Sequence, residues 1–421
     1  MLSSSKREIY NIFWYKFFII FGIFFLVASL VFNTPTQIFQ GFLKILTSSG
    51  VLLTDYMEVG NIGATFFNVS LMIFLSVAIL FFSKTEVSGV VIAAVVNVAG
   101  FAMMGKNPYN SLSPIIGVYL YSIFMEEDFF MYTPIALFAT SVAPFVSYIT
   151  FYSGFPLLEG ALIGNLTGLV MGFVLSAVSV NAKNLHRGYN LYNNGLAMGL
   201  IAVATNGILN LFGLNVVSEN IILHGVNPKL VIVMCGSFLA LMFGRIFISK
   251  TSYEDYFDLL MEIGISPAEF SYKYDNWTVL FNMGMCGFLG IAYTILVGGN
   301  LNGATLGGIM LVVAFAAFGV TPKNAIPIML GVFIASFTGI YEVTADGIVI
   351  AALFGTCLAP VAGDYGLIAG VITGFMHLAL VTKTGVLHSG LFLYNNGFTA
   401  GIITAIVVPF FESIRLALTK R

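Results

Sequence analysis

A five-residue string, Leu-Tyr-Asn-Asn-Gly, occurs twice in the chain and carries polar groups suited to binding a solute. It occupies residues 191–195 and 393–397, opens an apolar segment each time, and follows a polar turn that holds His186 or His388. An Asn can cap a helix, and a Gly lets the backbone turn tightly. We expect each string to start a broken or half-length helix whose free N–H groups face a central cavity, as in many transporters. The predicted substrate-binding residues are Tyr192, Asn193, Asn194, Tyr394, Asn395 and Asn396.

An ordinary helix cap at a membrane boundary, with the Tyr in the aromatic belt, is the alternative interpretation of this string. The alternative would leave the string without contact to a solute. Binding is favoured because a cap needs a single Asn, whereas both copies keep all five residues.

A second repeated pattern runs through residues 105–110 and 319–324, where a Gly is followed by a Pro and then by an Asn. This order is typical of a turn or a helix break. A buried break would free backbone groups to meet a solute beside Asn110 and Asn324, whereas a break at the surface would be only a tight loop. Both interpretations stay open, and Asn110 and Asn324 join the substrate-binding candidates.

Ionisable residues within apolar sequence are candidates for ion coupling, because a charge at membrane depth is costly unless it has a role. The candidates are Glu159, Asp346, Asp364 and His377, and none has an acidic or basic counterpart in the other half of the chain. Asp364 and His377 are the best placed for proton or sodium coupling. A simple position at the membrane boundary is the alternative for Asp364.

Enzyme and metal chemistry find no support in the sequence. HExxH, GxSxG and phosphate-loop patterns are missing, and Cys235, Cys286 and Cys357 lie in apolar runs without metal-site or disulfide spacing. We therefore expect no catalytic residues, no cofactor and no bound metal. A membrane-embedded enzyme stays an unsupported alternative.

The amino-acid composition indicates that the segments that position these residues lie in a membrane. Of 421 residues, 58% are hydrophobic and only 9% are charged, so lipid is the expected solvent for most of the chain. The expected partners are the lipid bilayer and a small-molecule solute, with no nucleic acid; a homo-oligomer is also compatible with the sequence.

The chain contains an internal repeat. Gly50 matches Gly264 and Gly105 matches Gly319, a shift of 214 residues, while His186 matches His388 at a shift of 202. The first copy therefore carries extra residues near 148–159. We predict two tandem membrane repeats, residues 1–213 and 214–421.

Each repeat contains about seven hydrophobic segments. They lie at residues 11–32, 61–82, 87–104, 111–125, 131–152, 160–180 and 191–212, and again at 227–248, 278–297, 303–319, 325–340, 346–361, 365–382 and 391–411. Seven crossings per copy would invert the second repeat relative to the first, whereas six crossings with a re-entrant segment would make the copies parallel. Some segments are expected to be half-length or re-entrant.

Orientation follows from the distribution of cations. With fourteen crossings and a cytoplasmic N-terminus, the only Lys or Arg residues on the outer face would be Lys44, Lys106, Lys229 and Lys383. We therefore expect a multi-pass protein of the cell membrane with both termini in the cytoplasm. A model with twelve crossings gives the same termini.

Two more polar stretches, residues 34–60 and 249–276, follow the first segment of each copy and have apolar residues at helical spacing. They are expected to form amphipathic helices on the membrane surface. The second stretch is acidic and could dock a partner, although a solvated face is the favoured interpretation.

The two strings and the Gly-Lys-Asn-Pro-Tyr-Asn turn of residues 105–110 give the chain a resemblance to an uncharacterised family of bacterial multi-spanning membrane proteins. That likeness covers nearly the whole chain and implies no particular mechanism. Residues 390–401, and less closely 188–199, also resemble the Gly-Leu-x-Gly-Phe/Tyr-Asn-Gly string of the urea transporters. The resemblance implies inverted repeats and a urea-like solute, while an extra Asn and a Leu in place of the second Gly depart from the motif.

These observations together predict an all-α polytopic membrane protein that acts as a transporter or channel for a small neutral or zwitterionic solute. Amides and tyrosines dominate the expected lining of its path. A proton- or sodium-coupled carrier, a membrane-embedded enzyme and a partner-binding membrane protein are the alternatives.

Overall fold

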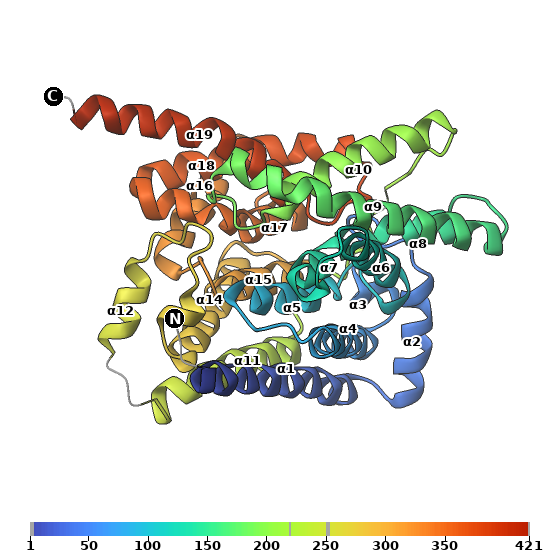
Figure 1. Ribbon diagram of the computed structural model, residues 1–421, viewed down its shortest axis with the longest axis horizontal. Coiled ribbons are helices and arrows are strands. Elements are labelled where there is room, and N and C mark those ends of the chain that lie inside the picture. Colours follow the sequence, from blue (N-terminus) through green and yellow to red (C-terminus); the bar gives the residue numbers. More distant parts are fainter. Residues whose placement is uncertain (1–3, 219, 250–252, 420–421) are drawn as a thin grey trace.

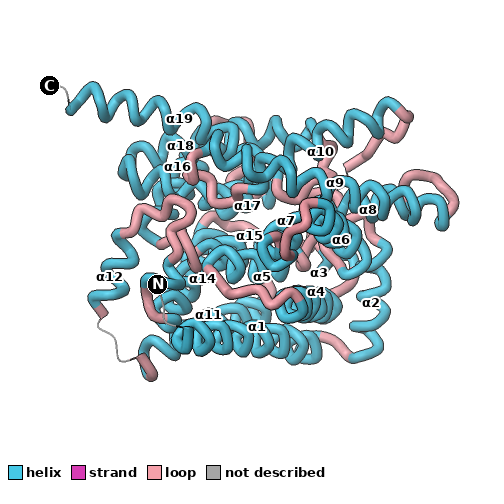
Figure 2. Tube along the Cα trace, viewed as in Figure 1, coloured by secondary structure: helices cyan, strands magenta, loops and turns pink. Residues whose placement is uncertain are grey.

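The apolar stretches fold as helices, because in lipid every backbone N–H and C=O group must find its partner within the protein. The computed structural model describes residues 4–218, 220–249 and 253–419, and within these ranges it contains helices and no β-strand (Figure 2). Nine of the described helices are long and apolar enough to cross a membrane. The prediction of a polytopic all-α membrane protein is confirmed.

The first copy consists of long helices interrupted by shorter ones. In chain order these are α1 (Ser4–Phe32), α2 (Pro35–Thr47), α3 (Tyr56–Val59), α4 (Ile62–Phe82), α5 (Gly89–Phe101), α6 (Pro108–Phe124), the 3-10 helix Phe129–Met131, α7 (Thr133–Ala139), the 3-10 helix Thr140–Val142, α8 (Ala143–Phe151), α9 (Leu157–His186) and α10 (Asn194–Leu211).

The second copy repeats this order. Its helices are α11 (Pro228–Phe247), α12 (Glu254–Met261), α13 (Phe270–Lys273), α14 (Asn276–Leu296), α15 (Gly303–Phe315), α16 (Pro322–Ser336), α17 (Asp346–Gly355), the 3-10 helix Thr356–Leu358, α18 (Ala359–Leu387) and α19 (Asn395–Thr419). Helix α18 corresponds to α8 and α9 together, since it bends at Gly366, where φ is 87°. The extra residues predicted for copy one lie at the end of α8, in the loop of residues 152–156 and at the start of α9.

The second copy is inverted relative to the first. The surface-lying helix α2 crosses one end of the long helices, and its counterpart α12 lies at the opposite end (Figure 1). We name these the α2 end and the α12 end. The short helices α5 and α15 pack antiparallel at the centre, with Gly89 against Phe318 and Gly100 against Gly307. This arrangement matches seven segments per copy, and the parallel alternative does not account for it.

Both ends of the described chain lie at the α12 end. The start of α1 and the end of α19 are on that side in Figure 1. The Tyr10 ring near the start of α1 lies 5.3 Å from that of Tyr272, which follows α12. Of the cations used to orient the chain, Lys250, Lys420 and Arg421 lie outside the described residues.

One buried Asn in each copy fixes the break that follows each short helix. The Nδ2 atom of Asn68 donates to the carbonyl oxygens of Ala102 and Lys106, at 2.7 and 2.8 Å. Asn282 donates in the same way to Ala316 and Val320, at 2.9 and 2.8 Å. These amides satisfy carbonyls that the end of a helix leaves without a partner, so the chain can leave the helix inside the membrane.

Repeated glycines allow the long helices to cross closely. A Cβ atom on Gly172 would lie 2.1 Å from the carbonyl oxygen of Pro114, and one on Gly374 would lie 2.1 Å from that of Ile328. Real Cβ atoms do not approach oxygen so closely. These glycines therefore allow close contact between α9 and α6 and between α18 and α16.

Candidate functional site

The two Leu-Tyr-Asn-Asn-Gly strings meet where the copies contact each other. The rings of Tyr192 and Tyr394 are both buried, and their centroids lie 5.5 Å apart. Gly195 packs so closely on Gly397 that a Cβ atom there would lie 2.9 Å from the Gly397 carbonyl carbon. The structure thus brings together residues that are 202 positions apart, at the starts of α10 and α19.

A His holds the first Asn of each string. The Nε2 atom of His186 lies 2.9 Å from Oδ1 of Asn193, and that of His388 lies 3.0 Å from Oδ1 of Asn395. The pair closes the loop between the turn and the helix start in each copy. This contact explains why both strings follow a His seven residues earlier.

The second Asn differs between the copies. The Oδ1 atom of Asn396 accepts a hydrogen bond from Nε2 of buried His377 at 3.0 Å. Copy one has Leu175 at the equivalent position, and the Oδ1 atom of Asn194 is buried without a partner. The structure therefore places His377, a predicted coupling residue, directly against a predicted binding residue.

Two cavities reach the strings from opposite ends of the molecule. The α2-end cavity has a volume of about 640 Å³ and touches the string of copy two, and the α12-end cavity has about 260 Å³ and touches that of copy one. Many of their lining residues are equivalent in the two copies. The equivalent pairs are Leu52 and Ser266, Ile350 and Pro134, Phe354 and Phe138, Val381 and Ser179, Leu393 and Leu191, Asn395 and Asn193, and Asn396 and Asn194.

A barrier of side chains separates the two cavities. Phe354 lines the α2-end cavity and its ring stacks on Phe101 at 5.3 Å, while Phe138 lines the α12-end cavity and its ring lies 6.3 Å from Tyr394. Tyr394 and Phe101 in turn contact each other at 4.8 Å. The cavities therefore end on opposite sides of one aromatic cluster.

Lys106 is buried inside this barrier, and the sequence analysis missed it. Its Nζ atom donates to the Tyr394 hydroxyl at 2.6 Å and lies 4.6 and 5.1 Å from the ring centroids of Tyr394 and Phe101. The same hydroxyl donates to Oδ1 of buried Asn97. The expectation that Lys106 lies at the outer face is wrong, because its side chain is fully buried. The sequence did contain a signal for this site, because Lys106 stands within a repeated helix break where the other copy has the apolar Val320.

Asn110 and Asn324 lie in the helix breaks and outside the lining of both cavities. Each is buried, and its Nδ2 atom donates to a carbonyl oxygen of the same break, that of Gly105 or Gly319, at 2.9 Å. Each also completes a capping box at the start of α6 or α16. The break is thus a buried one, but its Asn side chains are used by the backbone.

The remaining ionisable candidates lie away from the strings. Asp364 accepts from the Tyr189 hydroxyl and forms an ion pair of 3.2 Å with Arg415 at the α12 end. Asp346 accepts from Asn300 and Asn302 at the α2 end, and Glu159 is exposed.

A carboxylate from each copy caps the short helix of the other copy, which the sequence analysis also missed. Asp55 accepts from the backbone N–H of Gly303, which starts α15, at 3.1 Å, and the equivalent Glu269 accepts from that of Gly89, which starts α5, at 3.2 Å. Burial raises the pKa of Asp55 to about 7 and raises that of Glu269. Glu269 therefore does not belong to a solvated acidic face, because it serves a helix N-terminus.

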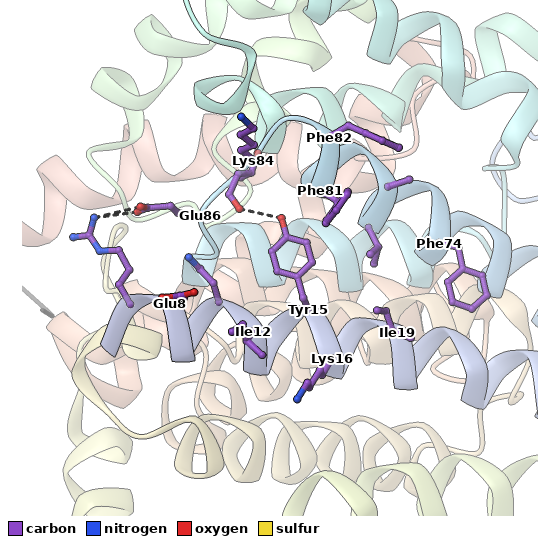
Figure 3. A pocket seen from close by; sticks show the side chains of 15 residues that line it. Glu8, Ile12, Tyr15, Lys16, Ile19, Phe74, Phe81, Phe82, Lys84 and Glu86 are labelled. Atoms are coloured by element: carbon purple, nitrogen blue, oxygen red, sulfur yellow. Dashed lines mark hydrogen bonds and ion pairs between the residues drawn. The ribbon is translucent and has the colours of Figure 1, made fainter. Parts of the chain in front are cut away.

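A separate groove of about 1270 Å³ lies between α1 and α4, on the outer surface (Figure 3). Arg7 and Glu86 form an ion pair of 3.2 Å at one end, and the Tyr15 hydroxyl donates to the Thr85 carbonyl oxygen. The other end is lined by apolar side chains such as Ile19 and Phe74 (Figure 3). None of its lining residues lines either of the two central cavities.

Comparison with known proteins gives a family and no function. The model of a family described as "Protein of unknown function (DUF1576)" matches residues 34–211 and 248–413. No curated protein and no solved structure matches the chain. The resemblance to an uncharacterised family is confirmed, and the likeness to urea transporters rests on the short motif alone.

Proposed function

We propose a function from the premise that the chain belongs to the DUF1576 family, whose function is unknown. The proposal is that it transports a small neutral or zwitterionic solute through the interface between its inverted repeats. The path runs from one cavity to the other across the two Leu-Tyr-Asn-Asn-Gly strings.

The observation that carries the proposal is the pair of opposed cavities. Equivalent residues of the two copies line them, they approach from opposite ends, and both end on the same repeated string. A solute path accounts for two cavities lined by equivalent residues of the two copies, whereas helix packing alone does not. Inverted repeats with a site at their interface are common in secondary transporters.

The lining of the cavities supports the class of solute. Neither is lined by a charged side chain among the residues that the structure describes, and amides, hydroxyls and apolar groups dominate both. Hydrogen-bonding groups without charge suit a solute of no net charge. The cavities are also small, at about 640 and 260 Å³, which favours a small solute.

The orientation is part of the proposal. The α12 end holds the start of α1 and the end of α19, and the predicted cytoplasmic cations include Arg7 and Arg415 in these two helices. We place this end in the cytoplasm and the protein in the cell membrane, so that the larger α2-end cavity faces outward.

A coupled carrier is the second candidate, and the contact between His377 and Asn396 favours it. A His that titrates beside a binding amide would link protonation to occupancy of the site. Flux that responds to a pH gradient, and no longer responds in His377→Leu, would separate this candidate from a channel.

The test of transport is flux through proteoliposomes that contain the full chain. Urea, acetamide, glycerol and glycine are offered in turn, and reswelling after osmotic shock is followed by light scattering. At least one solute should enter faster than in protein-free liposomes. The double variant Asn194→Ala with Asn396→Ala should slow it about tenfold, the effect of losing about one hydrogen bond to the solute. Asn210→Ala, at an exposed position on α10, is the matched control.

Transport would be refuted if no solute in the panel entered faster than in empty liposomes. The site assignment would be refuted if the double variant transported as fast as the wild type while the solute still moved.

The geometry of the two cavities has its own test. Ser179 and Val381 are equivalent residues that line opposite cavities. In a chain with Cys235→Ala, a membrane-impermeant maleimide should label Ser179→Cys from the α12 side and Val381→Cys from the α2 side. Labelling of both from one side would contradict the opposed cavities.

A further inference from the structure

We infer that the solute carries a carboxylate and that Lys106 binds it. The inference rests on the proposed function and narrows its solute class to small zwitterions, which carry a carboxylate. It makes the barrier between the two cavities a binding site as well as a gate.

The fold does not need a lysine at this position. The backbone carbonyl of Lys106 receives a hydrogen bond from Asn68, and the same loop of copy two is built around Val320, whose carbonyl receives one from Asn282. Asn97, on the other side of the Tyr394 hydroxyl, has Leu311 as its counterpart. The break therefore folds with apolar side chains in one copy, so Lys106 and Asn97 serve something other than folding.

These two residues offer hydrogen-bond donors that the protein does not use. A lysine side chain has two donors as the neutral amine and three as the ammonium, and Lys106 directs one of them to the Tyr394 hydroxyl. The Nδ2 atom of Asn97 is buried and has no partner among the residues that the structure describes. Lys106 and Asn97 thus have unused hydrogen-bond donors on either side of the Tyr394 hydroxyl. Such donors suit a ligand with several lone pairs, and a carboxylate has two oxygens with about four acceptor sites.

No ion pair between described side chains includes Lys106, and its contacts are with Tyr394 and Phe101. Burial without a counter-ion disfavours the ammonium form, so the neutral amine is favoured when no anion is bound. A carboxylate bound beside Lys106 would stabilise the ammonium form through an ion pair. Helix α19 starts at Asn395, directly after Tyr394, and adds the positive end of its dipole. An anionic group is the ligand that this field favours.

Two rings connect Lys106 with each cavity. Lys106 contacts Phe101, whose ring stacks on Phe354 of the α2-end cavity, and it contacts Tyr394, whose ring packs against Phe138 of the α12-end cavity. Rotation of these rings would expose the ammonium to one side or the other. A carboxylate that displaces the Tyr394 hydroxyl from Lys106 would thus meet the same group from both sides.

The experiment measures thermal stabilisation of the purified full chain by matched pairs of probes. The pairs are acetate with acetamide, glycine with glycinamide, and lactate with lactamide, each at equal concentration and ionic strength. In the wild type, the carboxylate of at least one pair should raise the midpoint of unfolding by several degrees more than its amide. Lys106→Met should lose this preference, and Lys106→Arg should keep part of it.

Lys44→Met is the control, because Lys44 is exposed on α2, away from the barrier. It should keep the full preference. The inference is overturned if amides stabilise as much as carboxylates in every pair, or if Lys106→Met keeps the preference. Circular dichroism and gel filtration establish that each variant is folded, and Lys106→Val, which copies Val320, replaces the Met variant if that one does not fold.

Failure of transport and failure of this inference give different results. A preference for carboxylates that depends on Lys106, without flux of any carboxylate into liposomes, would retain the binding site and reject transport. Flux of neutral solutes alone, with no carboxylate preference, would retain transport and reject the role of Lys106.

Discussion

The two Leu-Tyr-Asn-Asn-Gly strings have the same residues and different surroundings. In copy two the Tyr394 hydroxyl contacts Lys106 and Asn97, and Asn396 contacts His377. In copy one the hydroxyl of Tyr192 and the Oδ1 atom of Asn194 are buried and have no partner within the described part of the chain. The sequence of the string is thus duplicated, while the polar contacts of its Tyr and second Asn side chains are found in copy two.

This difference separates residues that build the fold from residues that act in it. Asn68 and Asn282 make the same contacts in both copies, and so do Asn110 and Asn324. Polar contacts that are repeated in this way hold the helix breaks. Polar residues found in one copy only are free to serve a solute, because the other copy folds without them.

The largest effect is expected at the repeated contacts. Asn68→Ala and Asn282→Ala should each destabilise the protein by about 2–5 kcal/mol, because each leaves two buried carbonyls without a donor. The two losses should be equal within error in unfolding by SDS titration. A loss confined to one copy would contradict the claim that the breaks are built alike.

The next largest effect is a difference in stability between variants of Tyr394 and Tyr192. Tyr394→Phe removes the partner of Lys106 and Asn97 and should cost about 2–4 kcal/mol. Tyr192→Phe removes a buried hydroxyl that has no partner and should change stability by less than about 0.5 kcal/mol, or raise it. The same SDS titration measures both. Equal costs would show that the surroundings of the two strings are not as different as described.

A smaller effect is expected at His377. His377→Leu copies the Leu175 of the other half and leaves the Oδ1 atom of Asn396 unpaired, at a cost of about 1–2 kcal/mol. Adding Asn396→Leu should recover part of this loss, since removing both partners of a buried pair is nearly neutral. Thermal unfolding in detergent measures both variants. A double variant less stable than the single one would argue that Asn396 has another essential partner.

The last effect depends on pH and concerns Asp55. Burial raises its pKa from the usual 3.8 to about 7 in the folded chain, so the folded state binds this proton more tightly than the unfolded state does. The stabilisation is complete below about pH 4 and is lost as the pH rises to about 7. The midpoint of unfolding of the wild type minus that of Asp55→Asn should fall over this window and stay constant above it. A difference that rises with pH would reverse the assignment.

Much of the fold was predictable from the sequence. In lipid, apolar runs of sufficient length have one stable secondary structure, and the matched residues from Gly50 to Gly401 define the duplication. The bend at Gly366 was visible only as a change in the shift between copies. Seven segments per copy then required inversion, which α2 and α12 confirm.

The candidate site was predictable in part. Repetition identified Tyr192 and Tyr394, which meet at the interface. Repetition also drew attention to Asn110 and Asn324, because a search for repeated polar residues cannot distinguish those that cap helices from those that face a cavity. Lys106 was missed for the opposite reason: it has no counterpart, and its burial depends on packing between residues that are 288 positions apart.

The capping of each short helix by the other repeat has a consequence for biosynthesis. The backbone N–H at the start of α5 donates to Glu269, a residue 180 positions later in the chain. The N–H at the start of α15 donates to Asp55, which is synthesised long before α15. While the ribosome is still translating the second repeat, α5 has its own Ser88 cap but lacks the Glu269 carboxylate, and its 13 residues are too few to span a bilayer alone. The first repeat can then be completed only after the second has entered the membrane. Residues 1–213 expressed alone should be degraded, and co-expression with residues 214–421 should rescue them, as pulse-chase labelling would show.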